Sequence, residues 1–156
     1  MIDLLMIGYG NELRGDDGAG PRVARAVAGW GRPGVRAPAV HQLTPELTAE
    51  LAEAERVVFV DAIVDSRMVC WRQVAAATGP APLGHTCDPG WLLALALALD
   101  ARAPAAWLVT VPARRLDCGA ELSPQAERDV GAVLRQLAAL AVNREAVLGT
   151  TGHGHD

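Results

Sequence analysis

The sequence contains no lysine, one tyrosine, one phenylalanine and three cysteines in 156 residues. All fourteen basic residues are therefore arginines, and they are scattered along the chain rather than gathered into the basic stripe typical of nucleic-acid-binding proteins. No segment reaches the ~18 consecutive apolar residues that a membrane-spanning helix needs. We therefore expect a protein that binds neither nucleic acid nor membrane.

The three cysteines are Cys70, Cys87 and Cys118, which are widely spaced and form no C-x-x-C motif. This spacing disfavours a disulfide framework and a cysteine zinc site, so we expect three small buried hydrophobic residues. Cys87 lies two residues after His85 and could instead be a nucleophile or a soft ligand, although the sequence identifies no activating partner. The first residues include Asp3 in a predicted strand, unlike a signal peptide, and we expect a cytoplasmic protein.

The length and composition predict one domain with an aliphatic core. Hydrophobic residues make up 51% of the chain, and the four tryptophans are expected to be large core fillers. A chain of this length buries roughly 70% of the surface that its unfolded form exposes, so no second core is needed. We expect a single domain over residues 1–148 and a polar, glycine-rich tail over residues 149–156, whose His153 and His155 we interpret as incidental.

Apolar runs and helix signals alternate along the chain. The predicted strands are residues 4–7, 35–40, 56–62, 67–74 and 105–111, and the predicted helices begin near residues 21, 45, 89 and 124. Strand 67–74 follows a turn too short for a parallel crossover, so it should run antiparallel to its predecessor. The pattern predicts an α/β fold, a three-layer α/β/α sandwich around a mostly parallel sheet of about five strands.

Polar residues follow several of these predicted elements. Asp16 and Asp17 come after the first strand and its glycine loop, Asp61 closes the strand 56–62, and His85 precedes the third helix. The carboxyl ends of parallel strands lie along one edge, so these side chains can converge. Two carboxylates and an imidazole suit zinc or nickel. Acids also cap helices and fill turns, and loop histidines are often solvated, so these interpretations remain open.

A nucleotide-binding turn is the alternative for the first loop. Gly8-Tyr9-Gly10 matches the first half of G-x-G-x-x-G, but Leu13 occupies the third glycine position. Two acids at the entrance of a helix also oppose a pyrophosphate, because that end of a helix carries a partial positive charge. The nucleotide interpretation is therefore the weaker one.

The segment IGYGNELRGDDGAG, residues 7–20, resembles the signature of the hydrogenase maturation proteases, which process the large subunit of nickel-iron hydrogenases. Later landmarks follow in the family's order: HQLTPEL at 41–47, VDA at 60–62, His85 before an apolar helix, and LSP at 122–124. The resemblance covers about residues 2–141.

This resemblance implies an endopeptidase that removes a C-terminal extension from the hydrogenase large-subunit precursor after nickel insertion. It also implies that Asp17, Asp61 and His85 contact the nickel, which the substrate carries, and that they form the catalytic site. Asp16 would be a neighbouring acid, interpreted as a helix cap. The interval from Asp61 to His85 is short for the family, and His41 is the only other histidine in the predicted domain.

No serine or cysteine nucleophile with an adjacent base is identifiable, which favours a route through metal and water over a covalent one. A non-enzymatic nickel sensor or chaperone with the same ligands is an alternative, as is the nucleotide-binding protein. We expect the protein to be a monomer.

Overall fold

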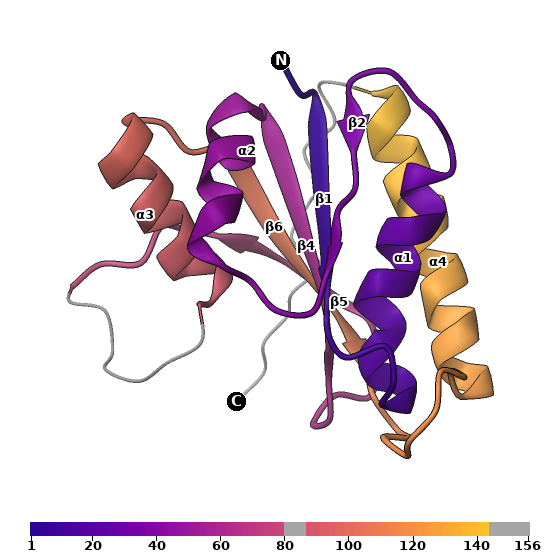
Figure 1. Cartoon of the computed structure of the whole chain (residues 1–156). Helices are drawn as coiled ribbons and strands as arrows, with labels where there is room; N and C mark the ends of the chain where they lie inside the picture. Colours follow the sequence, from indigo (N-terminus) through magenta and orange to yellow (C-terminus); the bar gives the residue numbers. More distant parts are fainter. Residues whose placement is uncertain (80–86, 144–156) are drawn as a thin grey trace.

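The structure is a computed structural model that describes residues 1–79 and 87–143. Figure 1 shows one sheet with α2 and α3 on one face and α1 and α4 on the other. The strands are β1 (Leu4–Tyr9), β2 (Val35–Arg36), β3 (Ala39–Val40), β4 (Arg56–Ile63), β5 (Cys70–Val74) and β6 (Ala105–Pro112). The helices are η1 (Gly15–Gly18), α1 (Ala19–Ala28), η2 (Pro45–Leu47), α2 (Thr48–Glu53), α3 (Pro89–Asp100) and α4 (Pro124–Val142).

The sheet has six strands in the order β2-β1-β4-β6-β5, with β3 also paired to β1. Every pairing is parallel except that of β5 with β6. The predicted three-layer α/β fold with one antiparallel strand is confirmed.

Two details of the predicted strands are wrong. The predicted strand 35–40 is split into β2 and β3, because Pro38 lies between them and has no N–H to donate to the ladder. The predicted strand 67–74 begins only at Cys70, and its neighbour in the sheet is β6 rather than β4. Its antiparallel direction was predicted correctly.

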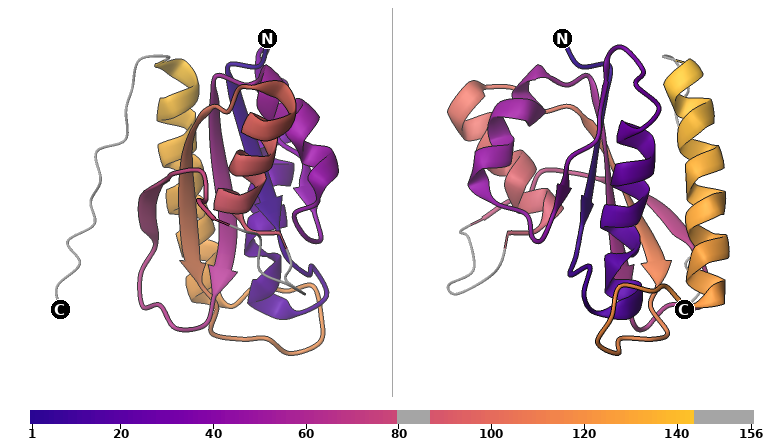
Figure 2. Two further views of the ribbon diagram at one scale, coloured as in Figure 1. Left: turned by 90° about the vertical axis from the view of Figure 1, so that its left-hand side faces the viewer. Right: turned by 45° about the vertical axis from the view of Figure 1, so that its right-hand side comes forward.

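Side chains on alternate strand positions form two cores, one under each pair of helices. Met6, Val58 and Trp107 pack with α1 and α4, whereas Ile7, Phe59 and Leu108 pack with α2 and α3. Figure 2 shows the helices on opposite sides of the sheet. Two aliphatic cores on one sheet are the expected result of near-continuous apolar strands.

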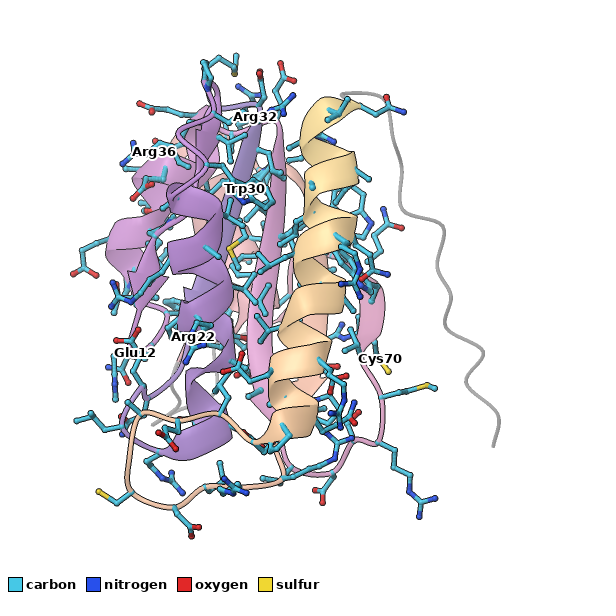
Figure 3. All side chains as sticks on the ribbon, turned by 90° about the vertical axis from the view of Figure 1, so that its right-hand side faces the viewer. Glu12, Arg22, Trp30, Arg32, Arg36 and Cys70 are labelled. Carbon is cyan, nitrogen blue, oxygen red and sulfur yellow. The ribbon has the colours of Figure 1, made fainter. Side chains whose placement is uncertain are left out.

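Several predictions of buried residues are wrong. Trp30 follows the end of α1 and is 38% exposed, so it is not the core filler that the helical spacing predicted. Figure 3 labels it beside α1. Cys70 and Cys118 are exposed and Cys87 is half-buried, because these residues lie at a strand end and in loops rather than in the core.

The helix starts follow their capping residues. Asp88 accepts a hydrogen bond from the Trp91 N–H, and Ser123 accepts one from the Ala126 N–H, each with proline at the first helical position. The helix predicted to begin at Pro45 opens instead with the 3-10 turn η2. In the parts of the chain that the structure describes, none of the helices combines the length and hydropathy needed to cross a membrane. His85 and the predicted tail with His153 and His155 lie outside the described residues.

Candidate active site at the carboxyl edge of the sheet

The chain after β1 turns back sharply so that η1 lies over the end of that strand. Gly10 has φ of 143°, a conformation that residues with a side chain rarely adopt, and a Cβ at this position would collide with the backbone carbonyl of Asp17. The Asn11 N–H then donates to Asp17 Oδ2 over 2.8 Å. The glycine therefore allows the Asp17 carboxylate to be fixed close to the edge of the sheet.

Asp61 lies near the carboxyl end of β4, close enough to Asp17 for the two charges to interact. Both are half-buried. Burial is the main cause that raises the pKa of Asp61 to about 6, and the negative charge of Asp17 raises it further. Hydrogen bonds from Tyr9 and from the Ala62 N–H act in the opposite direction. The structure thus brings together two of the three predicted site residues, with Asp61 too poorly solvated to carry its charge easily.

Two residues at this site were missed by the sequence analysis, Tyr9 and Arg72. The Tyr9 phenol hydrogen-bonds to Asp61, and its pKa is raised by burial and then by the Asp61 charge, so it remains protonated. The Asp88 charge raises the Tyr9 pKa further, and the Arg72 charge lowers it. The signal that could have found Tyr9 is strand alternation, since Tyr9 and Asp61 each lie two residues after a residue of the same core.

Asp16 does not act as the predicted cap of its own helix, because its carboxylate makes no capping bond in η1. It accepts hydrogen bonds from the Arg114 and Arg115 N–H groups at 2.8 and 3.0 Å, and from the Ser123 N–H and hydroxyl at 2.7 and 2.8 Å. Figure 2 shows the loop before α4 beside the start of α1. Burial alone raises the pKa of Asp16, but these four donors outweigh it and hold the pKa below its usual value.

Solved structures with this architecture were found among hydrogenase maturation proteases. The HybD protease from Thermococcus kodakarensis is 25% identical, with a TM-score of 0.64 over 90% of this chain and 99% of that chain. The HycI protease from Thermococcus kodakarensis KOD1 is 19% identical, with a TM-score of 0.70 over 90% and 92% of the two chains. HybD from Escherichia coli is 21% identical, with a TM-score of 0.66 over 90% and 92%.

This chain has the fold of the NiFe hydrogenase maturation proteases. The resemblance predicted from the opening motif is confirmed at the level of the fold. Neither a protein-family model nor a curated protein sequence matches the chain. The likeness is therefore one of three-dimensional structure.

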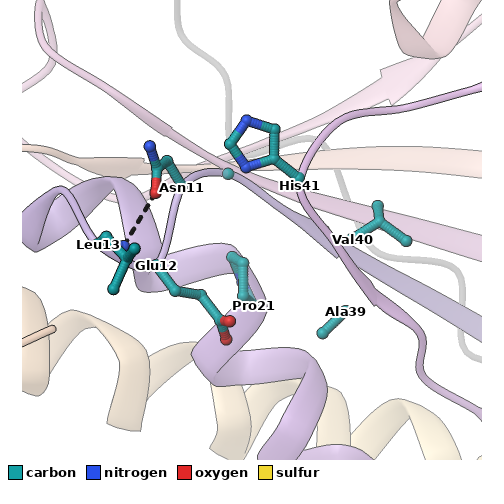
Figure 4. Close-up of a pocket in the computed structure, with 8 residues that line it drawn as sticks. Asn11, Glu12, Leu13, Pro21, Ala39, Val40 and His41 are labelled. Carbon is teal, nitrogen blue, oxygen red and sulfur yellow. Dashed lines mark hydrogen bonds between the residues drawn. The ribbon is translucent and has the colours of Figure 1, made fainter.

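A pocket of about 220 Å³ opens between the β1–η1 loop and β3 of this maturation-protease fold. Its lining comes from the β1–η1 loop, β3 and the start of α1, and includes Asn11, Glu12, Pro21, Val40 and His41. Figure 4 shows His41 and Asn11 near one another at this pocket. Asn11 links this pocket to Asp17 through its backbone N–H, whereas neither Asp17 nor Asp61 lines the pocket.

Glu12, one of the residues that line this pocket, forms an ion pair with Arg25 of α1. Glu12 accepts two hydrogen bonds from the Arg25 guanidinium, at 2.6 and 2.9 Å. Figure 3 shows Glu12 together with Arg22, which pairs with Glu127 of α4 over 3.0 Å. Both pairs are exposed, so they orient side chains but add little to stability.

The described residues supply two of the three side chains expected to contact nickel. Within residues 1–79 and 87–143, no three His, Cys, Asp or Glu side chains gather closely enough to hold a metal ion. His41 therefore does not complete a set with Asp17 and Asp61, and His85 lies outside the described residues. Two neighbouring carboxylates nevertheless suit a divalent cation, because its charge would relieve their mutual repulsion.

Cys87 does not have the properties of a catalytic nucleophile. Burial and the adjacent Asp88 charge raise the pKa of its thiol to about 11, so little thiolate exists at neutral pH. This environment agrees with the sequence analysis, which found no activating partner for Cys87.

Proposed function

We propose that this protein is an endopeptidase that removes the C-terminal extension of a nickel-iron hydrogenase large-subunit precursor after nickel has been inserted. Three observations support the proposal: the opening motif at residues 7–20, the fold shared with hydrogenase maturation proteases, and the pairing of Asp17 with Asp61. The proximity of Asp17 and Asp61 is the strongest of the three, because it places two half-buried carboxylates at the edge where ligands bind in parallel α/β sheets.

In this proposal the nickel arrives as part of the substrate. Asp17, Asp61 and His85 would contact it, and the metal would polarise the scissile carbonyl or a water molecule. Contact with nickel would verify that insertion had occurred and would place the scissile bond beside the carboxylates. One carboxylate would accept the proton of the attacking water and return it to the departing amine, so the peptide bond is replaced by a free carboxylate and a free amine.

Asp17 and Asp61 are the candidates for this proton carrier, because both carboxylates lie at the carboxyl edge of the sheet where the substrate's metal would bind. Asp16 is excluded from this role because all four of its hydrogen bonds are to fixed groups of the loop before α4. Cys87 is excluded as a nucleophile by the raised pKa of its thiol.

The test is cleavage of a nickel-loaded precursor, followed by intact-mass measurement. The wild-type protein should shorten the precursor once, whereas Asp17→Ala and Asp61→Ala should each reduce the rate by at least about 100-fold. A nickel-free precursor should remain uncleaved. Full cleavage by both variants would eliminate the proposal, and tight nickel binding without any shortening would favour the nickel sensor or chaperone instead.

We also propose that the protein works as a monomer in the cytoplasm, where the precursor is assembled. Sedimentation of the purified chain tests the first point, and fractionation of cells tests the second. No observation favours the nucleotide-binding alternative, and the acids Asp16 and Asp17 at the entrance of α1 oppose a pyrophosphate there.

A further inference from the structure

The only tyrosine of the chain lies at the last position of β1, directly against the candidate site. It packs on the core beneath α2 and α3, and the strand register sets it beside Asp61, toward which its phenol acts as a donor. We propose that Tyr9 is a positioning residue that holds the Asp61 carboxylate in the orientation needed to contact the substrate's metal ion. This inference rests on the proposed function, since it assigns a role toward the same metal.

The sheet itself places Tyr9 and Asp61 on the same face. Gly8 pairs with Val60 in the parallel ladder between β1 and β4, so Tyr9 lies level with Asp61 on the adjacent strand. Ile7 and Phe59, two residues earlier in each strand, both face α2 and α3. Side chains repeat their face every second residue, so the phenol and the carboxylate meet above the same core.

The Asp61 carboxylate is held by few donors. Tyr9 and the Ala62 N–H are the two hydrogen-bond donors that lower its pKa, whereas a carboxylate offers about four lone-pair positions. The carboxylate therefore keeps acceptor capacity for a cation or a water molecule. A phenol held by core packing on the neighbouring strand restricts the rotation of this carboxylate.

The charges around the phenol also suit this role. Asp61 and Asp88 surround it with negative charge, and Arg72 on β5 supplies the opposing positive charge. Arg72 pairs in the ladder with Leu108, which belongs to the same core, so all these groups share one face of the sheet. The phenol hydroxyl is a donor on the same face as Asp61, so it can stabilise the carboxylate.

The test uses Tyr9→Phe, which removes only the hydroxyl and keeps the ring in the core. Partners that orient metal-contacting carboxylates typically change metal affinity or activity by 10–100-fold when they are removed. We expect Tyr9→Phe to weaken binding of Ni²⁺, measured by calorimetry on the full chain, by about 10-fold or more. In precursor cleavage the loss should raise KM as well as lower kcat, because the precursor carries the nickel that Asp61 contacts.

A second readout follows from the single tyrosine. Protein labelled with ¹³C at the tyrosine Cζ should give one resonance, and Ni²⁺ should broaden it in the wild type at low metal concentration. In Asp61→Asn the broadening should require much more Ni²⁺. A tyrosine with a purely structural role would show no such dependence on Asp61.

The control is Trp71→Phe, which also removes one aromatic hydrogen-bond donor. The Trp71 indole donates to Gln136 over 2.7 Å on the opposite face, beneath α4. This variant should lose stability but bind Ni²⁺ as the wild type does.

The possible failures are distinguishable. If Tyr9→Phe binds Ni²⁺ and cleaves the precursor like the wild type while Asp61→Asn does neither, the role of Tyr9 is wrong and the proposed function stands. If Asp61→Asn cleaves normally, the proposed function itself is wrong. Equal losses of Ni²⁺ affinity in Tyr9→Phe and Trp71→Phe would also overturn the positioning role.

Discussion

Asp16 and Asp61 are both carboxylates at the same edge of the sheet, but their surroundings differ in the number of hydrogen-bond donors. Asp16 is 0% exposed and accepts four hydrogen bonds from a loop about one hundred residues away in the chain. Asp61 is half-buried, has two donors and faces a second carboxylate, Asp17. A buried carboxylate with a full set of donors stabilises the fold, whereas one with too few is suited to bind a cation.

The opposite pKa shifts express this difference. Hydrogen bonds lower the pKa of Asp16 despite its burial, while burial and the charge of Asp17 raise the pKa of Asp61. Ionised Asp16 therefore stabilises the folded protein, and this contribution is lost as the pH falls through its folded-state pKa. Ionised Asp61 destabilises it.

The largest expected effect on stability is that of Asp16→Ala. The substitution leaves the Arg114, Arg115 and Ser123 N–H groups without their acceptor, and we expect a loss of about 3–4 kcal/mol in the free energy of unfolding. Urea denaturation followed by circular dichroism measures it. Asp117→Ala, an exposed acid of the same loop, should change little, and equal losses in the two variants would contradict the structural role of Asp16.

The second prediction concerns the pH dependence caused by Asp61. Its folded-state pKa of about 6 exceeds the ordinary 3.8, so the folded protein binds this proton more tightly than the unfolded chain. Stability should therefore fall as the pH rises from about 4 to about 6, by up to about 3 kcal/mol. Asp61→Asn should remove that decline, as measured by urea unfolding at several pH values. If the free energy of unfolding changed with pH in the same way in the variant and the wild type, the pKa of Asp61 would not be raised in the folded protein.

The third prediction tests whether the Gly10 turn positions the Asp17 carboxylate in addition to stabilising the fold. Gly10→Ala should cost about 2 kcal/mol, because the φ of 143° is strained for alanine and the Cβ meets the Asp17 carbonyl. Gly119→Ala has a similar φ of 138° but open space around its Cβ, so it is the matched control for backbone strain. Only Gly10→Ala should also weaken Ni²⁺ binding, measured by calorimetry. Equal Ni²⁺ affinities would mean that the turn does not position Asp17.

The smallest expected effect is that of Cys87→Ala on precursor cleavage. A thiol with a pKa of about 11 supplies almost no thiolate at neutral pH, so its removal should change the rate by less than about 2-fold. The rate of precursor shortening on a gel measures it. Abolished cleavage in a folded variant would show that Cys87 is required and would contradict a mechanism that uses only the two carboxylates and the metal.

The sequence-based predictions were accurate where structure is specified by residues close together in the chain. The long strands β4 and β6 and the helices that begin at Pro89 and Pro124 were predicted closely, because apolar periodicity and capping residues act within a few positions. The division of 35–40 into two strands and the exposure of Trp30 were missed. Both follow from where an element ends, at Pro38 for the strand and at Ala28 for α1, and element ends are weakly specified by apolar periodicity.

The candidate site shows the same division. The glycine loop, the acids after it and Asp61 at a strand's end were recognisable from the order of residue types, and parallel topology implied that Asp17 and Asp61 would meet. The interpretation of Asp16 as a helix cap was wrong, since its hydrogen-bond donors come from residues 114–123. Tyr9 was missed because its partner lies on another strand.

The sequence by itself determined the layered α/β fold and the positions of the acids in the chain, because hydrophobic periodicity and turn chemistry operate over short distances. Only the tertiary structure decided which acid is stabilised by donors and which is left poorly solvated. Hydrogen bonding and desolvation at one carboxylate depend on groups brought together from β1, η1, β4 and the loop before α4, and no local pattern specifies that arrangement.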